Sequence, residues 1–175
     1  MKCSIKIYLK ILLPLLFIFF FTSNVNAGVV RDYINKYHNL VEQLSAEYGI
    51  PRSVITAISI VESGAGQTKN GRLLNNHFGI VGKNNLLKTN GIKTMFKQYP
   101  NAEASFKDFC GMVSRKKYYA KLKGNKSSLL WINAMAKAGY STQPEVWKKL
   151  ILNAIKKYNL DKPNNISHSK WTIIN

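Results

Sequence analysis

Apolar residues recur at intervals of three and four along two adjacent stretches of the chain. In residues 30–48 this spacing predicts an amphipathic helix that ends at Gly49. Its apolar positions are Tyr33, Tyr37, Leu40, Val41, Leu44 and Tyr48. Pro51 suits the first turn of a second helix, whose apolar pattern continues as far as Gly64. We therefore expect two consecutive helices joined by a short turn.

The amino-acid composition changes after Gly64. Residues 64–99 are rich in Gly, Asn and Lys, with short apolar stretches on either side of the turn-like sequence KTNG. This composition predicts a loop followed by a small β-hairpin lobe. Helical spacing then returns in four stretches: residues 101–114 with Asn101 as the cap, a short one near Tyr118, residues 127–138 and residues 144–158. The chain is expected to be mainly α-helical.

The first 27 residues have the features of a secretory signal peptide. Three lysines precede an apolar core at residues 11–21, and the segment closes with the sequence VNA. Such a leader is cleaved after its last small residue, here Ala27. A membrane anchor is the alternative, but the apolar run is shorter than the about 20 residues that span a bilayer. Residues 1–27 are therefore interpreted as a signal peptide.

The exported chain would begin at Gly28 and contain 148 residues, which is 175 minus 27. Its single cysteine, Cys110, excludes an intramolecular disulfide. This length fits one domain, assigned to residues 28–160, followed by a loose tail at residues 161–175 that lacks periodicity. We expect a secreted or periplasmic monomer with no membrane span once the leader is removed.

The charge of the chain points to an anionic partner. The sequence has 26 Lys and Arg and 8 Asp and Glu; removal of three leader lysines leaves 23 minus 8, or +15. Such an excess attracts anionic polymers. Nucleic acid is not expected, because lysines greatly outnumber the arginines that usually read bases and phosphates. Attraction to a cell wall and a merely solvated surface both remain open.

One of the few acids, Glu62, is placed in the last turn of the second predicted helix, within AISIVESGAGQT. The helix dipole disfavours a carboxylate there, and Ile58 and Ile55, four and seven positions back, give it an apolar setting. Both effects raise the pKa of a carboxyl group. A carboxyl protonated near neutral pH suits the general acid of a glycosidase. The alternative is a structural Glu that bonds loop amides.

Three motifs in order resemble one enzyme family. AISIVESGAGQT is followed by NNHFGI at residues 75–80 and by AGYST at residues 138–142, which leads into VWKKLILNAIKKYNL. From about residue 45 to 160 the chain resembles the bacterial glucosaminidases of the flagellar and autolysin type. The resemblance implies a lysozyme-like α+β fold with the hairpin lobe flanking a cleft. It also implies cleavage of the β-1,4 bond after N-acetylglucosamine in peptidoglycan glycan strands.

The resemblance assigns roles to particular positions. Glu62 matches the catalytic acid, and Tyr140 matches the tyrosine that faces it. Asn76, Phe78 and Gly79 match the loop that lines the cleft and contacts substrate. Each has a structural alternative: Tyr140 as a core aromatic, Phe78 as a plug beneath the lobe, and Asn76 as a residue that shapes a turn.

Four other residues also bear on the expected site. Of the adjacent Tyr118 and Tyr119, one is expected to point inward and the other, taken as Tyr119, to bind substrate by stacking on a sugar. Ala65 stands where the family usually has a tryptophan, so one stacking surface is expected to be absent. His77 has no companion ligands in the sequence, so neither a metal nor a cofactor is expected.

The family's second carboxylate has no evident counterpart. Residues 64–101 contain no Asp or Glu, which leaves Glu103 and Asp108 as fallback candidates. Attack by the substrate's own 2-acetamido oxygen is therefore favoured over water guided by Tyr140. The alternatives are a lytic transglycosylase, a wall-binding protein on a degenerate hydrolase fold, and an envelope-disrupting basic protein.

Overall fold

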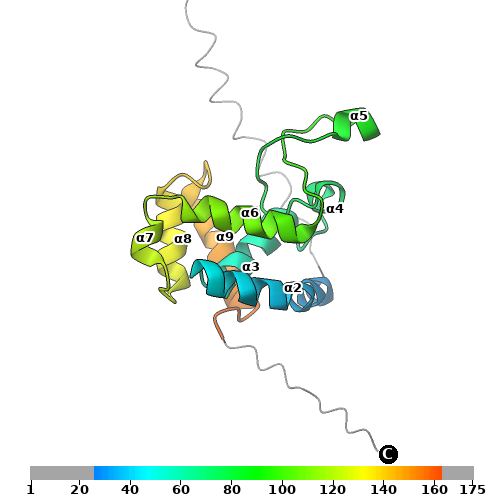
Figure 1. Cartoon of the computed structure of the whole chain (residues 1–175). Helices are drawn as coiled ribbons and strands as arrows, with labels where there is room; N and C mark the ends of the chain where they lie inside the picture. Colours follow the sequence, from blue (N-terminus) through cyan, green and yellow to red (C-terminus); the bar gives the residue numbers. More distant parts are fainter. Residues whose placement is uncertain (1–25, 163–175) are drawn as a thin grey trace, which may run out of the picture.

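The computed structural model describes residues 26–162 (Figure 1). In that part of the chain the helices are α2 (Ala27–Tyr48), α3 (Arg52–Ser63), α4 (Lys69–Leu74), α5 (Leu86–Asn90), α6 (Ala102–Ser114), α7 (Tyr119–Leu122), α8 (Ser128–Lys137) and α9 (Pro144–Lys157). Every helix expected from the pattern is present. The short helices α4 and α5 lie in the segment interpreted as loop and hairpin, and were not predicted.

Local sequence explains where the main helices begin and end. Gly49 and Gly64 adopt left-handed conformations, with φ of 64° and 57°, and terminate α2 and α3. Glycine takes this conformation without steric cost, so the helix stops where the pattern places it. At the other end, the side chain of Asn101 accepts a hydrogen bond of 2.9 Å from the Ala104 amide and caps α6.

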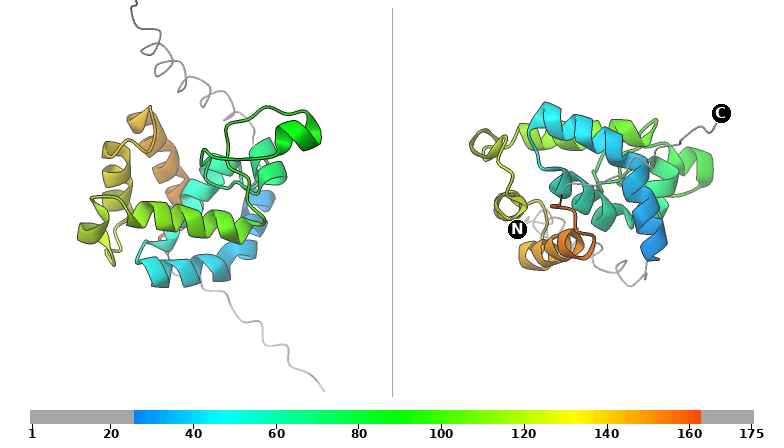
Figure 2. Two further views of the ribbon diagram at one scale, coloured as in Figure 1. Left: turned by 45° about the horizontal axis from the view of Figure 1, so that its top comes forward. Right: turned by 90° about the horizontal axis from the view of Figure 1, so that it is seen from below.

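Helix α3 is the centre of the packing. It contacts α2, α8 and α9, while α6 packs against α2 (Figures 1 and 2). Ten of its twelve residues are buried, including Val54, Ile55 and Ile58. A helix enclosed on so many sides is rigid, and it holds the Glu62 side chain at a fixed place near its C-terminal end.

The β-hairpin lobe expected from the sequence is not formed as a sheet in the described residues. The two arms are antiparallel but meet in a single bridge, between Val81 and Phe96. The pairing stops because the amide of Asn84 bonds the carbonyls of Thr94 and Phe96, at 3.0 and 2.9 Å, in place of a partner strand. A loop bearing α5 therefore projects from the helical body (Figure 1).

The sequence KTNG, read as the hairpin turn, instead ends a helix. Its first three residues belong to α5, and Gly91 caps that helix in the left-handed conformation at φ 66°. A helix C-cap and a tight hairpin turn both require positive φ, so the same Asn-Gly pair suits either. The expectation of a hairpin turn here was wrong.

The ends of the described segment bear on two other expectations. The signal peptide lies almost wholly outside the described residues, as does the tail from residue 163 onward. Asp161, placed in the loose tail, is in fact tied to α8, because its carboxylate accepts a 2.9 Å hydrogen bond from Ser128. Cys110 is a free, buried thiol. Between residues 26 and 162, no helix is long and apolar enough to cross a membrane.

Candidate active site

The Glu62 carboxyl lies at the C-terminal end of α3 and reaches α9. Its Oε1 accepts a hydrogen bond of 2.9 Å from the indole Nε1 of Trp147. The side chain is partly buried, whereas its neighbours Val61 and Ser63 are buried. Trp147 comes 85 residues later in the chain, and its indole is a partner of Glu62 that the sequence reasoning missed.

Burial raises the pKa of Glu62 to about 7, while the hydrogen bond from Trp147 acts in the opposite direction. Desolvation disfavours the charged form of a carboxyl group, and an indole N–H that bonds the carboxylate favours it. The direction agrees with the sequence expectation. At neutral pH a substantial fraction of Glu62 is protonated and can donate a proton.

Tyr140 is close to this carboxyl group. Its ring packs on Trp147 with centroids 4.8 Å apart, and it meets Phe109 edge-on at 6.2 Å. Its hydroxyl is buried without a hydrogen-bond partner among the described residues. Burial raises the pKa of Tyr140 well above its usual value, and the charge of Glu62 adds to this. A buried, unpaired donor beside an acid is a candidate for contact with substrate.

The two adjacent tyrosines have different surroundings. The hydroxyl of Tyr119 donates a 2.6 Å hydrogen bond to the carbonyl of Tyr48, at the end of α2. Burial raises the pKa of Tyr118 to about 12, and Tyr118, like Tyr99, adds to the raised pKa of Tyr140. Both rings also meet Trp131 edge-on. The Tyr119 hydroxyl is therefore used in a contact with α2, and stacking of its ring on a sugar stays a prediction.

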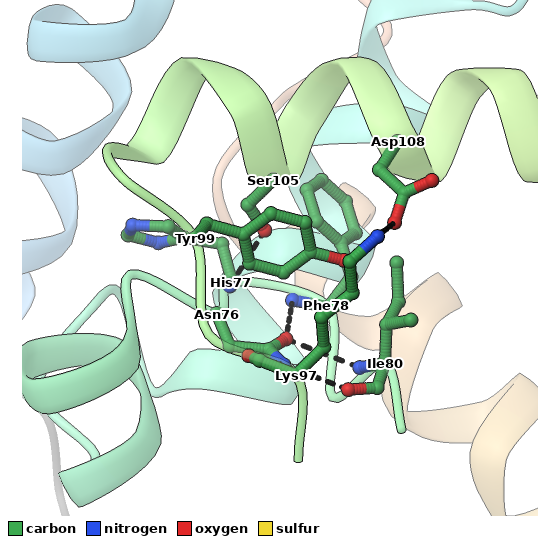
Figure 3. A network of polar contacts seen from close by, with 8 residues as sticks. All are labelled: Asn76, His77, Phe78, Ile80, Lys97, Tyr99, Ser105 and Asp108. Carbon is green, nitrogen blue, oxygen red and sulfur yellow. Dashed lines mark hydrogen bonds and ion pairs between the residues drawn. The ribbon is translucent and has the colours of Figure 1, made fainter. Parts of the chain in front are cut away.

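Asn76 is a structural organiser of the loop expected to line the cleft. It is 1% exposed, and its Nδ2 donates to the carbonyls of Ile80 and Lys97, both at 2.8 Å (Figure 3). Its Oδ1 accepts from the amides of Phe78 and Ile80 at 3.4 and 3.1 Å. Because both ends of the amide are occupied by backbone, the structure favours the turn-shaping alternative over direct substrate contact.

We expect Asn76→Ala to lower the free energy of unfolding by about 2 to 4 kcal/mol, since the buried Asn76 amide is lost and the Lys97 carbonyl and the Ile80 amide lose the partner it provides. Urea denaturation followed by circular dichroism measures the loss. Asn84→Ala is the matched control: Asn84 bonds backbone in the same way but is more exposed, so water can replace its amide. An Asn76→Ala protein of unchanged stability with a raised KM would restore the substrate-binding assignment.

Phe78 and Gly79 follow Asn76 but differ from each other. Phe78 is 3% exposed and stacks on Phe109, with centroids 4.1 Å apart and planes at 8°. It also meets Phe106 edge-on at 4.9 Å. Phe78 is thus a core residue beneath the loop, as its structural alternative stated. Gly79 is partly buried at φ 63°, where a side chain would be strained, and its backbone stays a candidate for substrate contact.

His77 is a buried structural residue. Its Nδ1 lies 2.9 Å from the Tyr33 hydroxyl, and its backbone amide donates a 3.0 Å hydrogen bond to Ser105. Burial, assisted by the charge of Lys36, lowers the pKa of His77 to about 4, so the ring is neutral at pH 7. In residues 26–162 no group of three potential metal ligands gathers.

Neither fallback carboxylate is arranged as a partner for Glu62. Glu103 is exposed in the first turn of α6 and pairs with Lys107 at 2.6 Å. Asp108 bonds Lys97 at 2.6 Å and Tyr99 at 2.7 Å, which ties the projecting segment to α6 (Figure 3). Burial alone would raise the pKa of Asp108, but these two hydrogen bonds outweigh it and the pKa is lowered.

Ala65 occupies a core position. It is 2% exposed and has φ of 54°, a left-handed conformation that non-glycine residues seldom adopt. A tryptophan side chain does not fit such an enclosed position without rearrangement. In this chain the aromatic group beside Glu62 comes from α9, as Trp147.

Comparison with known families gives one match. Residues 38–160 match the model of the glucosaminidase family, described as mannosyl-glycoprotein endo-β-N-acetylglucosaminidase. This range contains the end of α2 and all later helices. No protein with curated annotation matches the chain.

Several solved structures share the fold. The catalytic domain of the autolysin Auto from Listeria monocytogenes is 18% identical, with a TM-score of 0.63 over 92% of this chain and 98% of that one. A truncated glycoside hydrolase domain of FlgJ from Salmonella typhimurium is 22% identical, with a TM-score of 0.60 over 74% and 97%. An N-acetylmuramoyl-L-alanine amidase from Staphylococcus aureus is 21% identical, with a TM-score of 0.64 over 78% of this chain; the chain covers 44% of that protein.

Proposed function

Since the chain belongs to the glucosaminidase family, we propose that it is an exported peptidoglycan hydrolase that cleaves the β-1,4 bond after N-acetylglucosamine, with Glu62 as the general acid. The observation that carries the proposal is the carboxyl group of Glu62. It lies at the end of a buried helix with its pKa raised to about 7, beside the unpaired hydroxyl of Tyr140. The net charge of +15, from 23 basic and 8 acidic residues after Ala27, favours approach to an anionic wall.

The acid step follows from this geometry. Protonated Glu62 donates its proton to the glycosidic oxygen while the bond from that oxygen to the anomeric carbon breaks. The electron pair of the broken bond stays on the leaving oxygen, and Glu62 becomes a carboxylate. The backbone of Gly79 and the ring of Tyr119 are the further candidates for contact with the sugar.

The second half of the reaction needs a nucleophile. Asp108 is held by Lys97 and Tyr99, and Glu103 is an exposed partner of Lys107, so we assign neither as base. We favour attack by the 2-acetamido oxygen of the substrate, which requires no second protein carboxylate. Water oriented by the Tyr140 hydroxyl is the other route.

Mass spectrometry of the fragments released from purified peptidoglycan tests the proposal. Products with N-acetylglucosamine at the new reducing end support it. Anhydro products, which lack one water, would identify a lytic transglycosylase instead. No release by a well-folded protein that still binds peptidoglycan would indicate a wall-binding protein.

Export is proposed from the leader sequence, and the exported form is expected to begin at Gly28. The basic, apolar and small-residue segments stand in the order that signal peptidases recognise. N-terminal sequencing of the protein recovered outside the cytoplasm checks this expectation. An exported protein that still begins at Met1 would contradict it.

A further inference from the structure

Trp147 contacts both Glu62 and Tyr140, yet the acid step proposed above assigns it no role. Its side chain extends from the first turn of α9 to the end of α3, and its Nε1 donates a 2.9 Å hydrogen bond to Oε1 of Glu62. Trp147 is 5% exposed. The bond is partly buried, and the low-dielectric surroundings of the indole strengthen it.

The indole is itself firmly placed. The backbone amide of Trp147 donates a 2.9 Å hydrogen bond to the Gln143 carbonyl, so the residue lies within the regular first turn of α9. Its ring packs on Tyr140, with planes inclined at 33°. Helix α9 in turn packs along α3, which carries Glu62. The direction of the N–H bond is thus set by two packed helices.

The chemistry of indole makes this contact selective between the two carboxyl oxygens. An indole N–H donates a hydrogen bond and cannot accept one. When Glu62 is protonated, its carbonyl oxygen is a better hydrogen-bond acceptor than its hydroxyl oxygen, so the indole N–H favours Oε1 as the carbonyl oxygen. The bond therefore favours the proton on Oε2, the oxygen that Trp147 does not contact.

We propose that Trp147 is a positioning residue that confines the acidic proton of Glu62 to Oε2 and so directs it to the glycosidic oxygen. The proposal rests on the proposed function of Glu62 as the acid. In the step, the proton leaves Oε2 for the glycosidic oxygen as the glycosidic C–O bond breaks and its electron pair remains on that oxygen. The negative charge left on Glu62 strengthens the bond from Trp147 to Oε1.

A neutral donor suits this task better than a cation. A lysine or arginine against Glu62 would keep the carboxyl ionised at neutral pH, so that no proton could be donated. The indole fixes the orientation and opposes the effect of burial only in part, since the pKa of Glu62 stays at about 7. The Glu62 carboxyl is therefore held in one orientation and still keeps its proton near neutral pH.

Trp147→Phe tests the proposal, since it removes the N–H and keeps an aromatic ring against Tyr140. We expect the basic limb of the pH profile of kcat to move up by about one pH unit, because a bond that favours the carboxylate is lost. We also expect kcat at pH 5 to 6 to fall about tenfold, with KM unchanged, because the proton is no longer confined to one oxygen.

Trp131→Phe is the matched control. Trp131 is equally buried, and its Nε1 donates a 3.0 Å hydrogen bond to the Asn125 carbonyl, which belongs to the loop before α8. This change should lower stability and leave the pH profile in place. A Trp147→Phe profile with an unmoved basic limb, or the same shift in Trp131→Phe, would overturn the positioning role.

A second measurement does not depend on turnover. In the ¹⁵N-labelled protein, the indole N–H resonance of Trp147 should shift with a midpoint near pH 7, and the shift should vanish in Glu62→Gln. An indole signal that ignores pH between 5 and 9 would overturn the proposed contact. A responsive signal in a protein that releases nothing from peptidoglycan would uphold the contact and remove the proposed function instead.

Discussion

Glu62→Gln is expected to lower the turnover of peptidoglycan by about 10²- to 10⁴-fold, the usual contribution of a positioned general acid. The amide keeps the shape of the side chain and can still accept the hydrogen bond from Trp147, but it has no acidic proton to give. Stability at neutral pH should be unchanged or higher, since the variant lacks a carboxylate at the C-terminal end of a helix. Release of soluble fragments and thermal melting together provide the test.

Two other acids are the controls for this prediction. Glu103→Gln removes an exposed carboxylate paired with Lys107 and should leave both turnover and stability near those of the unmodified protein. Asp108→Asn should lose stability, because Asp108 accepts hydrogen bonds from Lys97 and Tyr99, yet it should keep most of its turnover. An inactive, well-folded Asp108→Asn would assign that residue as the second carboxylate. An active Glu62→Gln of reduced stability would make Glu62 structural.

The Glu62→Gln variant should also show a pH dependence of stability that is nearly cancelled in the unmodified protein. Burial lowers the pKa of His77 from 6.5 to about 4, so between these values the unfolded chain binds a proton that the folded protein does not. The contribution of His77 to stability is therefore complete above pH 6.5 and is lost as the pH falls toward 4. His77 is 3% exposed. A change of two pH units within this window changes the free energy of unfolding by at most about 3 kcal/mol.

The contribution of Glu62 to stability changes with pH in the opposite direction. Burial raises its pKa from 4.5 to about 7, so between these values the folded protein holds a proton that the unfolded chain releases. Its contribution is greatest below pH 4.5 and is lost as the pH rises toward 7. From pH 4.5 to 6.5 the two contributions oppose each other, and the stability of the unmodified protein should change little.

In Glu62→Gln the contribution of His77 remains alone. We expect the free energy of unfolding of this variant to rise by about 2 kcal/mol between pH 4.5 and 6.5, measured by urea denaturation; the rise is less than two full pH units would give, because half of the unfolded histidine is already deprotonated at pH 6.5. The range stays above pH 4.5 because the lowered pKa of Asp108 adds its own acid-side loss below that. A Glu62→Gln protein whose stability is flat across this range would show that His77 is not buried in its neutral form.

The local pattern of the chain determined the helices and their ends. The three-four spacing of apolar residues and the glycines at 49 and 64 set the limits of α2 and α3, because glycine accepts the left-handed conformation that ends a helix. The same reasoning placed Glu62 in a last turn. Its raised pKa followed, since an apolar setting and a helix C-terminus both disfavour a carboxylate.

The projecting segment shows where local pattern is ambiguous. An Asn-Gly pair suits both a hairpin turn and a helix cap, and the sequence does not say which wins. The outcome depends on Asn84, whose amide occupies the carbonyls of residues that would otherwise pair with a strand. Asn76 and Phe78 likewise have roles set by their neighbours, as a backbone organiser and a core ring.

Only the tertiary structure decided which side chains surround the acid. The contact between Glu62 and Trp147 joins residues 85 positions apart, and it depends on how α9 is rotated and shifted against α3. Periodicity marks the buried face of a helix, but it does not say which buried atom meets which. The hydrogen bond of Tyr119 has the same origin, because the Tyr48 carbonyl that accepts it lies 71 residues earlier in the chain. The sequence by itself determined an acid at the end of a buried helix, and packing between distant helices determined which groups contact its carboxyl.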